Sequence, residues 1–282
     1  MCRWYNFNVP TPFYHLAVAE SLLHHPDLSN NVRESLMEQR GAFLFGNTAP
    51  DVQVVSGQER HATHFFKVPI RPGSQLPWTR LISAYPALAR PDVLTGAQAA
   101  FLAGYLCHLQ ADWYWILLIF APVFGPDSTW GTFPERLYLH NVLRSYLDMQ
   151  VMSELPARTP GRLKQVRPKN WLPFVEDRHL LEWRDYLAQQ LEPGAAAQTV
   201  EVFAARQGIS PGEFYQLLES EERMDEQVFS RLPRRSLSVY RGGLVELNLR
   251  TLESFYSGDG WLSSQPVEHR KLISDFLDEV SA

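Results

Sequence analysis

Residues 101–116 read FLAGYLCHLQADWYWI, a nearly unbroken apolar stretch that holds one imidazole and one carboxylate. His108 and Asp112 stand four positions apart, so in a helix they lie on one face, one turn from each other. Burying an ionised carboxylate is costly unless the group is paired or bound to a metal. The stretch therefore predicts a buried helix that carries a polar pair into the core, with a compensating charge supplied from elsewhere in the chain.

The composition is that of a folded globular protein. The chain has 282 residues, of which 45% are hydrophobic, enough to fill a sizeable core. A net charge of −5 argues against a general nucleic-acid binder, which usually carries a basic surplus. No secretory signal and no run of membrane-spanning length is visible, and two cysteines, Cys2 and Cys107, cannot form a disulfide framework. We therefore expect a cytoplasmic protein without a transmembrane segment.

Hydrophobic periodicity predicts helices along most of the chain and no strand of any length. Residues 41–51, GAFLFGNTAPD, are expected to form a break that leaves Asp51 on a loop, because they contain glycine, asparagine and proline. Helices are expected over residues 13–23, 30–40, 78–84, 95–122, 135–155, 177–191, 195–207, 210–229, 237–256 and 267–280. The predicted fold class is all-α, a single multi-helix bundle.

One domain is expected over residues 1–282. Within it, residues 1–155 hold the candidate metal ligands and residues 156–282 supply additional packed helices. The basic, proline-bearing segment RTPGRLKQVRPKN, residues 158–170, is the expected internal connection between the two parts.

Five residues in the first half are candidate metal ligands. The His108–Asp112 pair alone also suits a simple hydrogen bond in a bundle core, and Asp51 alone suits turn formation. Together, however, the imidazoles and carboxylates form a set typical of zinc sites, with manganese and iron as alternatives. Two carboxylates allow one of them to bridge two ions, which can activate a water during phosphate-ester cleavage. The candidate ligands are His15, Asp51, His64, His108 and Asp112.

Four segments, in order, resemble the zinc-dependent phospholipase C family, whose members are all-helical. FYHLAVAESLL is similar to its first histidine helix, FLFGNTAPD to its aspartate loop, THFF to its next histidine segment, and GYLCHLQAD to its G-x-x-x-H-x-x-x-D helix. The resemblance implies that Asp51, His64, His108 and Asp112 bind one ion. Asp112 would bridge to a second ion that also uses His15.

The sequence departs from the family at two points. Secreted members use the N-terminal tryptophan of the mature chain as a ligand, and here Cys2 or the nearby backbone would have to take that role. The family's third site needs an H-x-x-x-E pair, but His140 is followed by Arg144. We therefore expect at most two ions. His140 is then structural or faces the substrate, and Arg144 contacts either an anion or Asp148.

The remaining site predictions concern the substrate. Arg60 and His61 are candidates for phosphate contacts or for support of the ligands, and Trp115 is a candidate pocket wall or a core residue. The predicted function is metal-dependent hydrolysis of a small-molecule or lipid phosphate ester, with Asp51 orienting or deprotonating the water. The alternatives are a lyase or cyclase on the same scaffold, and a non-catalytic protein whose metal stabilises the core.

Overall fold

The computed structural model describes residues 10–71, 73–192, 198–264 and 269–281, and within them every regular element is helical. The predicted all-α fold is confirmed. Cys2, proposed as a ligand, lies outside the described residues.

The central element is α7 (Gly96–Trp115), which continues as the π-helix η4 (Ile116–Phe124). Thr95 caps α7, since its hydroxyl accepts a hydrogen bond from the backbone N–H of Gln98. Pro122 was expected to end this helix, but the wider turns of η4 accommodate it until Phe124. By length and composition alone Gly96–Phe124 could cross a membrane, but 78% of its most apolar window is buried inside the protein, which is typical of a core helix.

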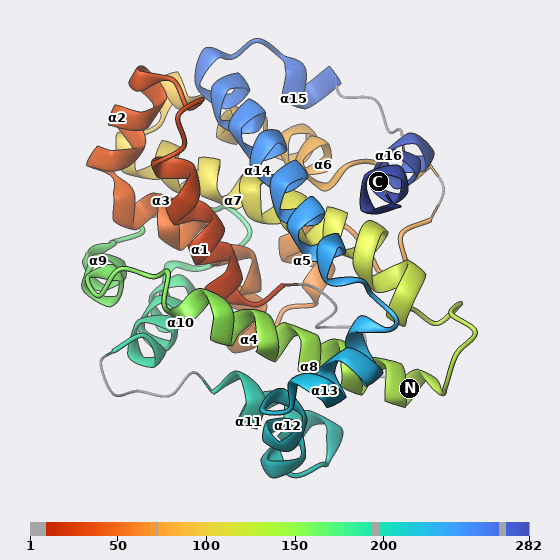
Figure 1. Ribbon diagram of the computed structural model, residues 1–282. Helices are drawn as coiled ribbons and strands as arrows, with labels where there is room; N and C mark the ends of the chain where they lie inside the picture. The colour runs from red at the N-terminus through yellow and green to blue at the C-terminus, as the bar shows by residue number, and fades with distance from the viewer. Residues whose placement is uncertain (1–9, 72, 193–197, 265–268, 282) are drawn as a thin grey trace.

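Four helices surround this central element (Figure 1). Helices α3 (Arg40–Gly46) and α14 (Arg234–Ser257) pack on α7, and α14 runs across it. Helix α1 (Pro12–Leu23) packs on α8 (Phe133–Met152), which also contacts η4. Their buried faces form one continuous hydrophobic core.

Shorter helices cover this bundle. Those of the first half are α2 (Asn30–Glu38), η1 (Ala49–Val52), α4 (Gln53–Ser56), α5 (Arg60–His64), α6 (Pro77–Ala84), η2 (Pro86–Ala89) and η3 (Pro91–Val93). Those of the second half are α9 (Thr159–Gln165), α10 (Asp177–Gln190), α11 (Thr199–Gln207), α12 (Pro211–Leu218), α13 (Glu221–Met224), η5 (Asp225–Phe229), α15 (Trp261–Ser264) and α16 (His269–Ser281).

Three sequence expectations about the helices are wrong. Residues 41–46 belong to α3 instead of a break, because residues 42–46 are buried against α7 and tertiary packing outweighs the glycines of this segment. Residues 210–229 do not form one helix, because Ser220 caps a new helix with its hydroxyl. The segment 158–170 is not a plain connection, since α9 forms inside it and packs on α3 and α10.

Two glycines allow α3 and α7 to approach closely. A Cβ on Gly104 would lie 2.3 Å from the Phe43 carbonyl oxygen, and one on Gly46 would lie 1.9 Å from that of Phe101. Neither distance is sterically possible, so both positions require glycine for this packing. The contact brings the turn after α3, with Asn47 and Asp51, onto the face of α7 that carries His108.

Candidate metal centre

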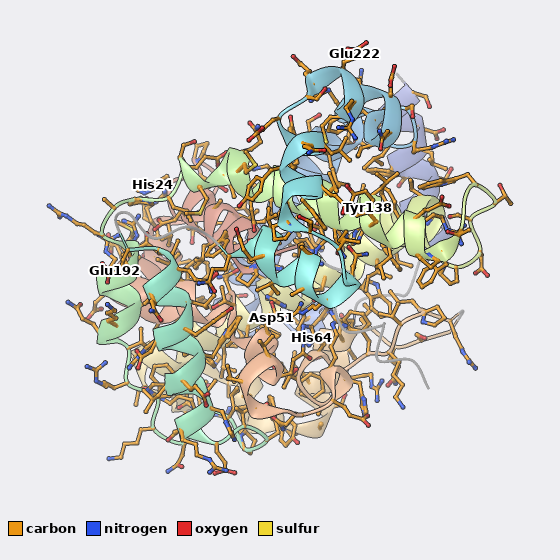
Figure 2. All side chains as sticks on the ribbon, turned by 90° about the horizontal axis from the view of Figure 1, so that it is seen from below. His24, Asp51, His64, Tyr138, Glu192 and Glu222 are labelled. Atoms are coloured by element: carbon orange, nitrogen blue, oxygen red, sulfur yellow. The ribbon has the colours of Figure 1, made fainter. Side chains whose placement is uncertain are left out.

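Four segments deliver the five predicted ligands to one place. His108 and Asp112 lie on α7, His15 lies on α1, Asp51 lies on η1, and His64 is the last residue of α5. Figure 2 shows Asp51 and His64 together in the interior of the molecule, while His24 and Glu222 lie at its periphery. His15, His64, His108 and Asp112 are at most 2% exposed and Asp51 is 6% exposed, so the cluster is a core feature.

The donor atoms converge around Asp112. Its Oδ2 lies 3.2 Å from His64 Nε2 and 3.4 Å from His108 Nε2, and its Oδ1 lies 3.3 Å from His15 Nε2. Asp51 Oδ1 lies 3.4 Å from His64 Nε2. Two overlapping groups have all their donor atoms within 4.8 Å of one another: His15, His108 and Asp112, and Asp51, His64 and His108. This spacing is compatible with coordination of a shared cation after small side-chain movements.

Hydrogen bonds fix the orientation of two imidazoles. His108 Nδ1 lies 2.8 Å from the Asn47 carbonyl oxygen, and His64 Nδ1 lies 3.2 Å from that of Arg60. A carbonyl only accepts, so each Nδ1 carries the proton and donates it. In the neutral rings each Nε2 therefore presents a lone pair to the cluster, which is the arrangement that metal-binding histidines adopt.

Two buried atoms of the cluster have no hydrogen-bond partner among the described residues. They are His15 Nε2 and Asp112 Oδ1, whose separation of 3.3 Å does not meet hydrogen-bond geometry. Buried polar atoms are normally satisfied, and an orphaned pair points to an additional partner. Because a lone pair and a carboxylate oxygen are both donors to metals, the residues fit a zinc ion.

Arg60 supplies positive charge to the same cluster. Its guanidinium donates a hydrogen bond to Asp112 and lies over the Phe66 ring, 4.7 Å from the centroid. It is 6% exposed, so this is a buried ion pair. Such a pair compensates the Asp112 carboxylate when no metal ion is bound.

The cluster strongly perturbs the pKa values of its members. Burial opposes ionisation of Asp112, but the neighbouring imidazoles of His108, His15 and His64 prevail and hold its pKa well below the usual range. Burial and the neighbouring His108 lower the pKa of His15 to about 4, although Asp112 opposes this shift. His15 is therefore neutral at physiological pH, which is the form that binds metals.

The comparisons agree with this geometry. The profile of the family described as "Zinc dependent phospholipase C" matches residues 14–182, more than half of the chain. The chain belongs to the zinc-dependent phospholipase C family. A search of curated proteins and one of solved structures found no match. Membership implies metal-dependent hydrolysis of a phosphate ester, and the matched region contains all five predicted ligands.

The other candidate residues of this zinc-dependent phospholipase C family member lie in different surroundings. His61 is half-buried and its Nδ1 lies 3.1 Å from Glu59. His140 is fully buried, where its Nε2 accepts a hydrogen bond of 2.9 Å from the Trp115 indole. The structure thus places His140 and Trp115 side by side in the core, and their predicted substrate contacts remain predictions.

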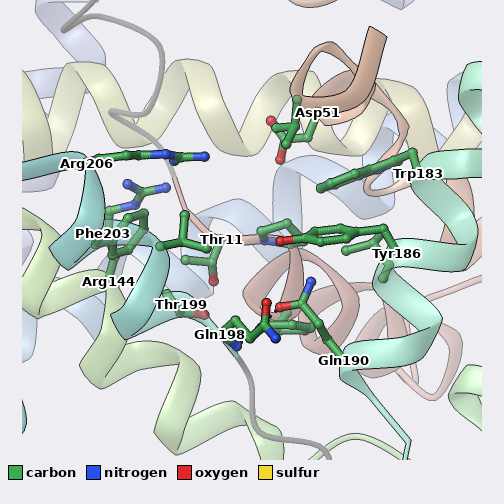
Figure 3. A pocket seen from close by; sticks show the side chains of 15 residues that line it. Thr11, Asp51, Arg144, Trp183, Tyr186, Gln190, Gln198, Thr199, Phe203 and Arg206 are labelled. Carbon is green, nitrogen blue, oxygen red and sulfur yellow. Dashed lines mark hydrogen bonds between the residues drawn. The ribbon is translucent and has the colours of Figure 1, made fainter. Parts of the chain in front are cut away.

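Sequence reasoning missed several residues beside the metal centre. The second half of the chain contributes Trp183, Tyr186 and Arg206, which line a cavity together with Asp51 and Arg144 (Figure 3). The Trp183 indole also donates a hydrogen bond of 2.8 Å to the Thr48 carbonyl, which attaches α10 to the turn that carries Asp51. No local motif marks these positions, because their relation to Asp51 depends on how α10 and α11 pack.

Proposed function

We propose that this protein hydrolyses a phosphate ester at a centre of one or two zinc ions. The observation that carries the proposal is the convergence of three imidazoles and two carboxylates in the core, two of whose atoms have no hydrogen-bond partner among the residues that the structure describes. Manganese or iron would also suit nitrogen and oxygen donors. The proposed ligands are His15, Asp51, His64, His108 and Asp112. When bound, such ions lower the pKa of water and neutralise charge on phosphate oxygens.

Asp51 is the member of the cluster that connects the centre to the outside. It lines the cavity of Figure 3, where the neighbouring His64 and His108 imidazoles outweigh the effect of burial and lower the pKa of its carboxyl. It is therefore ionised at neutral pH. A carboxylate at that position can orient the attacking water or accept its proton.

The other residues of the chain hold this arrangement in place. The Asn47 and Arg60 carbonyls orient the two imidazoles, and the Arg60 guanidinium holds Asp112. Phe66 and Trp113 pack edge to face beside the cluster and help to exclude bulk water. We also propose a cytoplasmic location, since two cysteines cannot form a disulfide framework.

A metal-exchange assay tests the proposed function. The protein is assayed against a panel of phosphate monoesters and diesters after purification, after chelation, and after addition of zinc. We expect turnover that chelation abolishes and zinc restores, and that is lost in His108→Ala. Substitution of the exposed His24 by alanine, the control, should leave turnover unchanged. Turnover that persists without metal, or that His108→Ala retains, would contradict the proposal.

Product analysis separates the competing activities. In water enriched in oxygen-18, hydrolysis places one labelled oxygen in the phosphate product, whereas a lyase or cyclase releases product without the label. A purely structural ion would be coordinated without an open position and would support no turnover. The exposure of Asp51 to the cavity favours a reactive site over a closed structural one.

A further inference from the structure

A small cavity adjoins the metal centre and has two chemically different sides. Its volume is about 80 Å³, which is room for a few water molecules or one small polar group. One side consists of the arginines Arg144 and Arg206, and Trp183 and Tyr186 lie on the other, with Asp51 above (Figure 3). The size and the charge of this space together indicate which kind of group it can hold.

Arg144 forms the deep part of the charged side. It is 3% exposed, donates a hydrogen bond of 3.1 Å to Asn141 Oδ1, and lies over the Phe203 ring at 4.4 Å. These contacts hold its guanidinium plane in position. Arg144 also stands where the family's H-x-x-x-E pair would have glutamate. A positively charged side chain therefore replaces one that would bind a metal ion.

Arg206 reaches the cavity from the last turn of α11, at the exposed rim. The charge of Arg206 contributes to lowering the pKa of Arg144, and the Asp51 charge acts in the opposite sense on the pKa of both arginines. Two arginines that face a single cavity suit phosphate binding, because guanidinium groups match its oxygen geometry and can donate two parallel hydrogen bonds.

The charge of the surroundings favours a dianion. Three guanidinium groups, those of Arg60, Arg144 and Arg206, stand beside the two carboxylates Asp51 and Asp112. Positive charge is therefore in excess before any divalent ion binds. Asp148, beyond Arg144, offsets this only in part, since burial raises its pKa to about 7.

We propose that the cavity is an anion subsite in which Arg144 and Arg206 bind the substrate phosphate next to Asp51, and that it favours doubly charged monoesters over singly charged diesters. This specificity rests on the proposed function. In the reaction, water oxygen bonds to phosphorus, the ester oxygen–phosphorus bond breaks, the alcohol leaves with a proton, and inorganic phosphate remains between the arginines.

Phosphate binding tests the subsite without requiring turnover. Inorganic phosphate is titrated calorimetrically into the zinc-loaded protein and into the zinc-loaded Arg206→Gln variant, whose substitution lies at an exposed position. We expect affinity to fall about 10- to 100-fold, the effect of losing charge-assisted hydrogen bonds, with zinc content unchanged. Arg178→Gln, at an exposed site on α10, is the matched control and should bind phosphate normally. Equal phosphate affinity in Arg206→Gln and the unsubstituted protein would overturn the proposal.

Kinetics then distinguish the subsite from the function on which it rests. With para-nitrophenyl phosphate and its bis-para-nitrophenyl diester, we expect a higher kcat/KM for the monoester and a preference that shrinks in Arg206→Gln. Arg206-dependent phosphate binding without hydrolysis of any ester would support the subsite and contradict the hydrolase. Hydrolysis that prefers the diester and is insensitive to Arg206→Gln would support the hydrolase and overturn the subsite.

Discussion

His64 Nε2 lies 3.3 Å from His108 Nε2, although the two residues are 44 positions apart in the chain. Each ring uses its Nδ1–H on a backbone carbonyl, so in the neutral state both Nε2 atoms present lone pairs to each other. Two facing lone pairs repel, and a proton or a metal ion between them removes the repulsion. The relationship therefore favours binding of a proton or a metal ion between the two rings.

The first prediction is that zinc stabilises the folded protein through this cluster. At a free zinc concentration about 100 times the Kd, binding contributes about 2.7 kcal/mol, and for a chain of this size Tm should fall by roughly 5–10 °C on chelation. His108→Ala should show no such fall, whereas His24→Ala should behave like the unsubstituted protein. Scanning calorimetry with and without chelator measures the difference, and equal Tm values for unsubstituted protein would refute the prediction.

The second prediction concerns the ion pair of Arg60 with Asp112. Arg60→Met leaves a buried carboxylate without its cation, so the metal-free protein should lose about 3–5 kcal/mol of unfolding free energy. A bound zinc ion compensates Asp112 itself, so the loss should be smaller in the zinc-loaded protein. Urea unfolding of both forms measures this. Arg90→Met, which breaks an exposed pair with Asp92, is the control and should change neither form detectably.

The third prediction concerns the contact between α3 and α7. Gly104→Ala places a methyl group 2.3 Å from the Phe43 carbonyl and 2.8 Å from the Asn47 nitrogen, so the helices must separate. We expect a loss of about 1–3 kcal/mol or more and weaker zinc binding, because Asn47 orients His108. In the matched control, Gly242→Ala in α14, the methyl group meets no atom within 4 Å and should stabilise the helix by up to about 1 kcal/mol. Equal zinc affinity in Gly104→Ala would count against the role of this packing.

The fourth prediction concerns the pH dependence that Asp148 confers. Burial raises its pKa from 3.8 to about 7, although hydrogen bonds from Thr11 and Thr199 and the charge of Arg144 oppose the shift. Between about pH 4 and pH 7 the Asp148 carboxyl keeps its proton in the folded state and has lost it in the unfolded state. Ionisation of Asp148 therefore makes the free energy of unfolding fall as the pH rises through this range. The change is about 4 kcal/mol and levels off above pH 7.

The substitution Asp148→Asn isolates the contribution of Asp148 to the pH dependence of stability. Asp148→Asn cannot ionise, so its unfolding free energy relative to the unsubstituted protein should rise between pH 4 and 7 and then stay constant. Asp275→Asn, at an exposed position of α16, should follow the unsubstituted protein at every pH. Urea unfolding across the pH range gives both curves, and a flat difference for Asp148→Asn would show that the carboxyl is not protonated in the folded state.

The sequence predicted helices well where hydrophobic periodicity and capping residues agree. The helix that begins after Thr95 follows such signals. The long helix predicted from residue 135 begins at Phe133, where the structure adds a capping box at Thr132. Prediction failed at residues 41–46, where burial against α7 outweighs glycine content, and at Ser220, whose capping hydroxyl starts a new helix. Local signals cannot anticipate the first case, because the deciding contact lies about 60 positions away on α7.

The amino-acid sequence by itself determined the helical class, the family and the five candidate ligands, because periodicity, segment order and residue chemistry are local properties. Tertiary structure alone decided that Arg60 pairs with Asp112, that the Trp115 indole donates a hydrogen bond to His140, and that Arg206 lines the same cavity as Asp51. These relations join residues far apart in the chain. They depend on how closely helices pack, which for α3 and α7 requires the absence of a side chain at Gly46 and Gly104.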